Sequence, residues 1–432
     1  MVVMLARATP TGVLPLAVLS AALHLVPSQT LASQESELCL VGYRTVYILP
    51  LEWAETTLPP TTATRWSWTP SADGTIRSNN LSAAFNGTVE CKPVDVLRTH
   101  HVGGHSSPPT AGAGRQLLVV SDTGGVAIVD RASQRVAFCA LVPGAHSAAL
   151  LPDSRVAVVA SHLDHGDRVA VFDIGAGMDP VYPEAIKSCQ REPHAEAPVP
   201  GAHGVAWVND TSTLLVVGGS ADNNDGFVYS FTLSTAISAP GGEETQHLAL
   251  NLTSKLPIAA HGPHDLSPYP LPSGIPVQSG PAFSLTALNG VWLYLAGAKQ
   301  AVPHPAHGLA PTQEVKSVSA LNNGTLVFVV EDRVGIGPAH FRSRILRYLS
   351  PSGSTWRAWN VSLPIAWLPV YKARIVPRMD ITTASQQPPL QRPVFVPNED
   401  GFVCFRALIL LSAGPHCLIA ASEGRSFYNP NT

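Results

Sequence analysis

Short apolar runs recur along most of this chain, and turn residues separate them. Typical runs are "RVAVVAS", from Arg155 to Ser161, and "TLLVVGGS", from Thr213 to Ser220. The runs are rich in β-branched or aromatic side chains and are bounded by Gly, Asp, Asn or Pro, which is typical of strands joined by hairpins. No amphipathic helix of comparable length competes with them. The pattern therefore predicts an all-β fold.

The runs group into repeated units. Two units begin alike, with "GAHSAALLPDSRVAVVAS" at Gly144 and "GAHGVAWVNDTSTLLVVGG" at Gly201, and similar units cover residues 90–363. Three further runs, at 38–43, 45–51 and 65–70, lack an innermost partner, whereas "YKARIV" at 371–376 is a single run. Together these four runs would form a sixth four-stranded unit, built from both ends of the chain. Such a unit closes a ring of sheets and leaves no open end in the ring. We predict a six-bladed β-propeller over residues 33–376, and a β-sandwich of similar strands is the alternative.

Aligning the units places one polar residue at the head of each first strand. Successive heads are 52 to 61 residues apart, which leaves room for four short strands and their turns. The first strands of a propeller line its central channel, so we expect the heads to converge in a ring at one face. In order, the heads are Lys92, His146, His203, His264, Lys316 and Lys372, and the three lysines are half of the six in the chain.

The turns between second and third strands should return to the same face. They would bring further polar residues to this rim: Asp122, His162, Asp164, His165, Asp167, Asp222 and Asp225. A simpler explanation for the aspartates is that Asp, Asn and Gly are good turn residues.

Several ordered motifs resemble one family of secreted propellers. "AHSAALLPDSRVAVVAS", "GAHGVAWV", "GPHDLSPYP", "VKSVS" and "YKAR" are similar to the recurring motifs of domain of unknown function family 6528, over roughly residues 40–375. The resemblance implies the six-bladed fold and brings no established activity. The chain departs from the family pattern at Ala149, where an acidic residue is common, and at Ile375, where an aromatic residue is common.

A ring of histidines and lysines offers several kinds of chemistry. Three neutral imidazoles, His146, His203 and His264, could hold a divalent metal, which is the candidate cofactor. The cations Lys92, Lys316, Lys372 and Arg374 are candidate contacts for an anionic ligand such as an acidic saccharide, whose charge they would neutralise.

Other roles for the same residues remain open. Ammonium groups disfavour a nearby metal unless anions intervene, so metal-free binding is a serious rival. One histidine could serve as base or nucleophile, and "AHSAALLPDSRV" is loosely similar to a motif of six-bladed sulfate-transferring enzymes. The histidines could instead tie neighbouring blades together, and the lysines could pair with Glu90, Asp265 or Glu314.

The two ends of the chain predict secretion and the boundaries of the folded domain. Residues 1–32 resemble a cleaved secretory signal, with Arg7, an apolar core too short for a membrane span and a small-residue cleavage site. A disordered apolar N-terminus is the alternative. We expect residues 377–432 to be a disordered tail or an incorrectly predicted coding end, because family-like sequence stops near Arg374.

Cysteines and glycosylation sequons agree with secretion. Six cysteines without a CxxC pair favour structural disulfides or buried thiols, and their connectivity stays open. Six N-x-S/T acceptors are present, at Asn80, Asn86, Asn209, Asn251, Asn323 and Asn360.

Composition narrows the classes of partner. Charged residues make up 13% of the chain and the formal net charge is -3, so no basic stripe for nucleic acid is present. We predict a secreted, monomeric propeller without membrane contact after signal cleavage, which binds a small polar or anionic ligand at the channel mouth. The alternatives are a non-catalytic protein-interaction scaffold and a histidine-dependent lyase, hydrolase or sulfotransferase.

Overall fold

The computed structural model describes the chain between residues 36 and 425, with gaps. The residues outside the description within this span are 43, 52–64, 73–75, 77–80, 95–114, 162–165, 175–188, 221–224, 238–245, 271–279, 305–313, 322–323, 332–342, 344, 353–354, 364–369, 378–403 and 415–416. Only the backbone is described for residues 72, 236–237, 246–247, 351–352, 355–357, 359, 361–362, 377 and 404–425. The predicted signal segment, residues 1–32, lies outside the described residues.

Six four-stranded antiparallel sheets make up the body of the protein. The first contains β24 (Ala373–Pro377), β1 (Ser36–Val41), β2 (Val46–Pro50) and β3 (Trp66–Trp68). The second contains β4 (Thr88–Val94), β5 (Gln116–Ser121), β6 (Gly125–Asp130) and β7 (Val136–Leu141), and the third β8 (Ala145–Leu151), β9 (Arg155–Ala160), β10 (Arg168–Asp173) and β11 (Ala195–Pro198).

The remaining three sheets follow in chain order. The fourth contains β12 (Gly204–Val208), β13 (Thr213–Gly219), β14 (Gly226–Ile237) and β15 (Gln246–Ile258). The fifth contains β16 (Asp265–Tyr269), β17 (Ala282–Ala287), β18 (Gly290–Leu295) and β19 (Gln300–Pro303), and the sixth β20 (Val315–Ala320), β21 (Leu326–Val330), β22 (Ile345–Ser352) and β23 (Thr355–Ser362). Short 3-10 helices lie between strands at Pro70–Ala72, Ser82–Phe85 and Asn209–Thr211.

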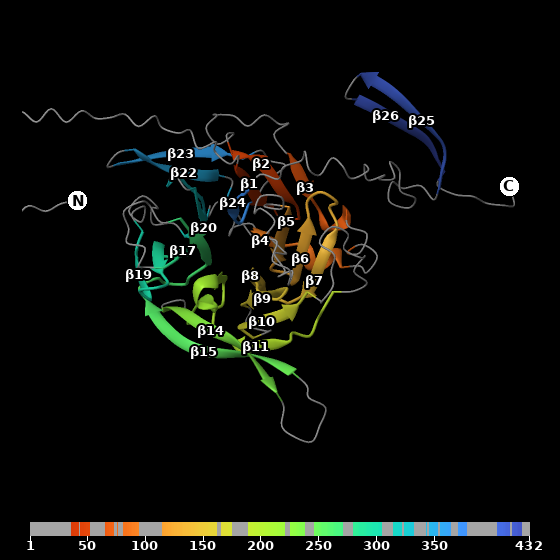
Figure 1. Ribbon diagram of the computed structural model, residues 1–432. Helices are drawn as coiled ribbons and strands as arrows, with labels where there is room; N and C mark the ends of the chain where they lie inside the picture. Colours follow the sequence, from red (N-terminus) through yellow and green to blue (C-terminus); the bar gives the residue numbers. More distant parts are fainter. Residues whose placement is uncertain are drawn as a thin grey trace, which may run out of the picture.

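The six sheets are the blades of a β-propeller, as the repeat predicts. Figure 1 shows β4, β8, β20 and β24 around the centre and β15, β19 and β23 at the periphery. A separate hydrophobic core lies between each pair of neighbouring sheets. One of these cores packs Leu40 of the first sheet against Val329 and Tyr348 of the sixth, which completes the ring.

The last strand of the ring belongs to the same sheet as the first. β24 pairs with β1 in antiparallel register from Ala373 opposite Leu40 to Pro377 opposite Ser36. The sheet thus extends one residue beyond the boundary at 376 that the sequence predicts.

Packing on both faces explains the continuous apolar runs in the sequence. Every residue of β5 and of β6 is buried, because each blade is covered by its neighbour on either side. A strand of this kind has no solvent-facing side on which polar residues could alternate with apolar ones.

Two disulfides resolve part of the cysteine connectivity. Cys39 of β1 is bonded to Cys91 of β4, which joins the first sheet to the second, and Cys139 of β7 is bonded to Cys189. Disulfides of this kind are compatible with an oxidising compartment.

The tail contains one hairpin that the sequence analysis did not predict. β25 (Cys404–Gly414) pairs with β26 (Cys417–Arg425) in a separate two-stranded sheet. None of the helices in the described parts of the chain has the length and apolarity of a membrane-spanning segment.

Candidate functional site

A register shift marks the heads of three innermost strands. It falls at His146 in β8 and at Lys316 in β20, each the second residue of its strand. In β4 the shift falls at Val89, so Lys92 lies three residues further along its strand than the other heads. The equivalent position in the second blade is therefore a valine, which corrects the sequence alignment. A bulge of one residue does not visibly change the pattern of residue types in a short strand of mixed sequence, so the alignment could not detect it.

The three histidines meet at one end of the channel. His203 and His264 directly precede β12 and β16, and His146 is the second residue of β8. The rings of His146 and His203 are stacked, with centroids 4.2 Å apart, and the ring of His264 meets that of His203 edge-on at 5.1 Å. All three side chains are half-buried. The convergence expected from the repeat is thus present for this half of the ring.

Backbone carbonyls hold two of the imidazoles. His146 Nε2 lies 3.2 Å from the carbonyl oxygen of Ser161, and His203 Nδ1 lies 2.9 Å from that of Gly201. A carbonyl oxygen only accepts hydrogen bonds, so these two ring nitrogens carry the protons. The other nitrogen of each ring is left as an acceptor.

Burial keeps the histidines neutral. Desolvation, with a further contribution from the charge of Lys372, lowers the pKa of His146 to about 3. Desolvation likewise lowers the pKa of His203 well below its ordinary value, and that of His264. A neutral imidazole is the form that accepts a hydrogen bond or binds a metal.

A carboxylate joins the third histidine to a lysine. Glu314 Oε1 contacts both His264 Nε2 and Lys316 Nζ, and Glu331 Oε2 lies 4.0 Å from the same ammonium group. Burial alone would raise the pKa of Glu314, but its contacts with His264 and Lys316 hold that pKa well below the ordinary value. The carboxylate is therefore charged, and it accepts a hydrogen bond from the N–H group of His264 Nε2.

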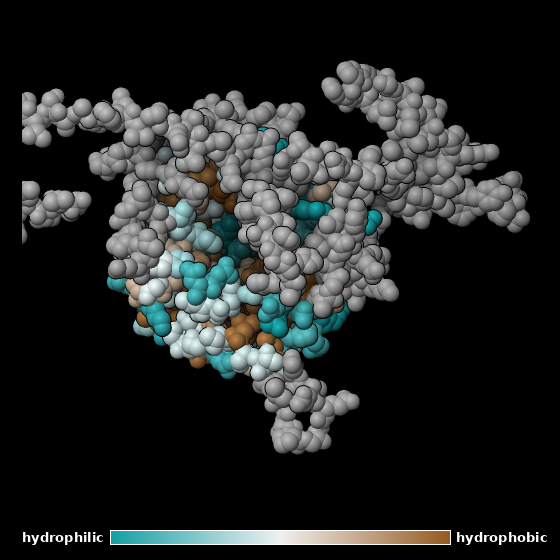
Figure 2. All heavy atoms as spheres, in the orientation of Figure 1, coloured by the Kyte–Doolittle hydropathy of each residue, from teal (hydrophilic) through white to brown (hydrophobic). Residues whose placement is uncertain are grey.

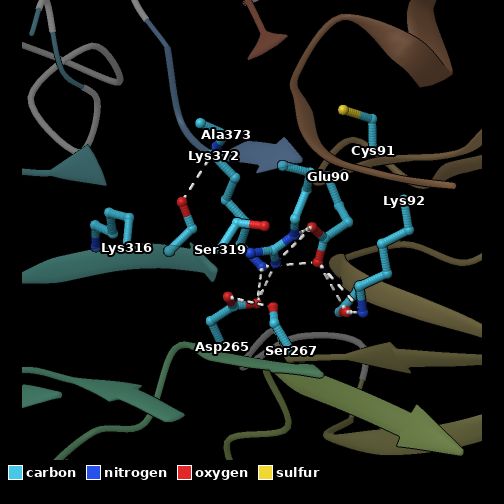
Figure 3. Close-up of polar contacts among 12 residues, drawn as sticks. Glu90, Cys91, Lys92, Asp265, Ser267, Lys316, Ser319, Lys372 and Ala373 are labelled. Atoms are coloured by element: carbon cyan, nitrogen blue, oxygen red, sulfur yellow. Dashed lines mark hydrogen bonds and ion pairs between the residues drawn. The ribbon is translucent and has the colours of Figure 1, made fainter. Parts of the chain in front are cut away.

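A second layer of charged groups fills the channel beside the histidines. We call it the ionic layer: Glu90, Lys92, Asp265, Lys372 and Arg374. Glu90 and Asp265 are fully buried, and Figure 3 shows them pointing toward one another from β4 and β16. Lys372 Nζ lies 3.1 Å from Glu90 and 3.2 Å from Asp265. Arg374 Nε donates to Glu90 at 2.8 Å, while its Nη2 donates to Asp265.

The ionic layer contacts all six innermost strands. Lys92 Nζ donates to Ser147 Oγ at 2.8 Å and to the carbonyl oxygens of Ala148 and Val205 at 3.2 and 3.0 Å. Lys372 also reaches the carbonyl oxygen of His146, and Arg374 that of Val318. Strands β4, β8, β12, β16, β20 and β24 are thereby tied together at the centre.

Opposite charges determine the ionisation of this layer. Burial would raise the pKa values of Glu90 and Asp265, but the neighbouring guanidinium of Arg374 and the ammonium of Lys372 lower both. Burial lowers the pKa of Lys92 to about 8, against the opposing attraction of Glu90. Both carboxylates, Lys92 and Arg374 are therefore predominantly charged at neutral pH.

The structure places the predicted site residues at two levels. His146, His203, His264 and Lys316 lie together at the channel mouth, in what we call the histidine layer. Lys92, Lys372 and Arg374 each have a carboxylate partner in the ionic layer. Ser147 was missed by the sequence analysis; its hydroxyl donates to Glu90 at 3.0 Å. A serine among small apolar residues carries no sequence signal of such a role.

One of the predicted rim residues has a clear structural role. Asp167 Oδ2 accepts a hydrogen bond from the backbone N–H of Gly201 at 2.7 Å, which holds the turn that leads to His203. His162, Asp164, His165 and Asp222 lie outside the described residues. Among the residues that the structure describes, no group of three or more His, Cys, Asp or Glu side chains is arranged to hold a metal ion.

Comparison with known proteins identifies no family. No family model matches the chain, and no curated protein matches it. Solved structures similar to it include a mitotic checkpoint complex, at 13% identity and a TM-score of 0.32 over 57% of this chain and 64% of that chain. The chain thus spans less than two thirds of that structure. The WD40 domain of Toxoplasma gondii coronin is 9% identical, with a TM-score of 0.37 over 78% of this chain and 70% of that chain. The six-bladed fold follows from the sheet topology itself.

Proposed function

We propose that this chain is a secreted propeller that binds a small polar ligand at the histidine end of its central channel. The observation that carries the proposal is the cluster of three half-buried, neutral imidazoles, in which His146 Nδ1 and His264 Nδ1 are buried without a hydrogen-bond partner among the described residues. Buried polar atoms are ordinarily paired, so these unmet acceptors favour a ligand that pairs them. Membership of the secreted family that the sequence resembles is part of the proposal.

A divalent metal at His146, His203 and His264 is the finer version predicted from the sequence. It is supported by the neutral rings and by the oxygen atom that holds one nitrogen of each ring, because metal-binding histidines usually donate their second N–H to an oxygen. The carboxylates beside the lysines also reduce the repulsion that a cation would meet. Metal binding would require the rings to turn toward a common point.

An anionic ligand at Lys92, Lys316, Lys372 and Arg374 is the other finer version. It is supported by four cations near one channel end. Each of them already has a carboxylate partner, so an anion would compete with Glu90, Asp265 or Glu314. Turnover of a bound ligand by one of the histidines stays a prediction.

A protein-interaction scaffold receives less support. Among the described residues, Leu252 is the one strongly exposed large hydrophobic side chain. On the face drawn in Figure 2, hydrophobic atoms occur in small groups between polar ones. A dedicated protein interface more often presents a larger apolar patch.

The proposal is tested with purified secreted protein. Melting temperatures are measured with saccharides, organic acids and divalent metals, for wild type and for His146→Ala, His203→Ala and His264→Ala. A ligand should raise the melting temperature of wild type and of the control His261→Ala, which changes an exposed histidine three residues before His264. The three site variants should lose the effect. Elemental analysis of the same samples tests the metal version, and responses unchanged in all three variants would contradict the proposal.

A further inference from the structure

The buried ring nitrogens at the channel mouth require hydrogen-bond donors. His146 Nε2 and His264 Nε2 face a carbonyl and a carboxylate oxygen, which only accept, so both Nε2 atoms carry protons. Nδ1 of each ring is therefore an acceptor. Neither Nδ1 has a partner among the described residues.

Two of the cations next to them, Lys92 and Lys372, use all of their N–H groups in other hydrogen bonds. The three N–H groups of Lys92 Nζ match three acceptors at 2.8, 3.2 and 3.0 Å. Those of Lys372 Nζ match Glu90, Asp265 and the carbonyl oxygen of His146. Turning either side chain toward an imidazole would leave a buried carboxylate or carbonyl group unpaired, which is costly.

The charges at this end of the channel are balanced among the described residues. Lys92, Lys316, Lys372 and Arg374 supply four positive charges, and Glu90, Asp265, Glu314 and Glu331 supply four negative charges. Such a balanced cluster gives no net attraction for an anion. The described residues also form no group that is arranged for a metal ion.

We infer that the ligand is a neutral polyhydroxylated molecule, a sugar or a polyol, whose hydroxyl groups donate hydrogen bonds to His146 Nδ1 and His264 Nδ1. The inference rests on the proposed function and names the class of ligand for that site. Both nitrogens are covered at present. The ring of His203 contacts both imidazoles, with ring centroids 4.2 and 5.1 Å apart, and a ligand reaches the two nitrogens when the three rings shift apart.

The test uses D-glucose, D-mannose and myo-inositol as neutral probes, and D-galacturonate, sulfate and zinc chloride as rivals. Isothermal titration calorimetry on the full secreted chain should detect a neutral probe and no comparable binding of the rivals. His264→Phe keeps an aromatic ring without the acceptor, so it should weaken the neutral probe at least about tenfold, as expected for the loss of a buried hydrogen bond. The matched control His261→Phe should leave the affinity unchanged.

A second variant keeps the test decisive. If His264→Phe does not fold, His146→Phe removes the other acceptor and should weaken binding in the same way. Binding of galacturonate, sulfate or zinc that depends on the histidines, without binding of a neutral probe, would overturn the inference and leave the proposed function standing. If no probe of any class binds, both fail.

Discussion

The histidine layer and the ionic layer lie side by side on the same innermost strands, yet their hydrogen bonding differs. In the ionic layer, Lys92, Lys372 and Arg374 meet carboxylates and carbonyl groups at ordinary hydrogen-bond distances. In the histidine layer, His146 and His264 each bury a ring nitrogen, Nδ1, that has no hydrogen-bond partner among the described residues. The difference indicates that the ionic layer holds the blades together, and it marks the two unpaired nitrogens of the histidine layer as the positions at which we propose that a ligand binds.

The ionic layer should be the more sensitive to substitution. Glu90→Gln keeps the shape of the side chain but leaves Lys92, Lys372 and Arg374 with one carboxylate, Asp265. Removing one partner of a buried charge network costs about 3–5 kcal/mol, so the free energy of unfolding in urea should fall by that amount.

The same substitution at an exposed ion pair is the matched control. Glu196 lies 3.6 Å from Arg168, and its side chain is 54% exposed. Glu196→Gln should cost less than about 1 kcal/mol. Equal losses at the two sites would show that the ionic layer does not stabilise the fold.

Acid should weaken the protein through the histidine layer. The pKa of His146 is lowered from 6.5 to about 3, so between these values the unfolded chain binds a proton that the folded chain does not. Stability is therefore fully present above pH 6.5 and falls as the pH decreases, by up to about 1.4 kcal/mol per pH unit for each such histidine, and by less where solvent reaches the ring.

Urea unfolding between pH 7 and pH 5 isolates this effect, because carboxyl groups stay ionised there in the unfolded chain. His146→Phe should show a shallower dependence on pH than wild type. A slope that is the same in the variant would contradict the assignment to this ring.

A single hydroxyl tests how far the ionic layer extends. Ser147→Ala removes the donor to Glu90 and an acceptor of Lys92. We expect a loss of about 1–2 kcal/mol in urea unfolding, typical of buried hydrogen bonds to charged groups. Ser71→Ala, at an exposed hydroxyl, should change stability by less than about 0.5 kcal/mol. A larger effect at Ser71 would be inconsistent with this view of the layer.

The smallest effect on stability is expected in the histidine layer at neutral pH. His146→Ala loses one hydrogen bond to the carbonyl oxygen of Ser161 but also removes a buried nitrogen for which the described part of the chain offers no partner. These contributions oppose each other, so the free energy of unfolding at pH 7.5 should change by less than about 1 kcal/mol. A loss as large as that of Glu90→Gln would assign the histidine a structural role instead.

Much of the fold could be predicted from the sequence because strand signals are local. The continuous apolar runs of β5 and β6 reflect burial on both faces, and the Gly-Ala-His repeat locates the innermost strands of two neighbouring blades. The surplus run at 371–376 and the three runs near the N-terminus account for the membership of the first sheet. The hairpin at 404–425 was not expected, since its apolar run was interpreted as part of an unstructured tail.

The candidate site could be predicted only in part. The convergence of His146, His203 and His264 followed from equivalent positions in a repeat. Lys92 was misplaced by three residues, because a single-residue bulge at Val89 shifts the register without changing the pattern of strand-forming residues.

The sequence by itself determined the number of blades, the order of the strands and the half of the ring that carries histidine. The tertiary structure decided which charges pair. Glu90 and Arg374 are separated by 284 residues and become neighbours only when the first and second blades meet at the channel. Electrostatic attraction and desolvation depend on distance and burial, and neither is encoded in the spacing along the chain.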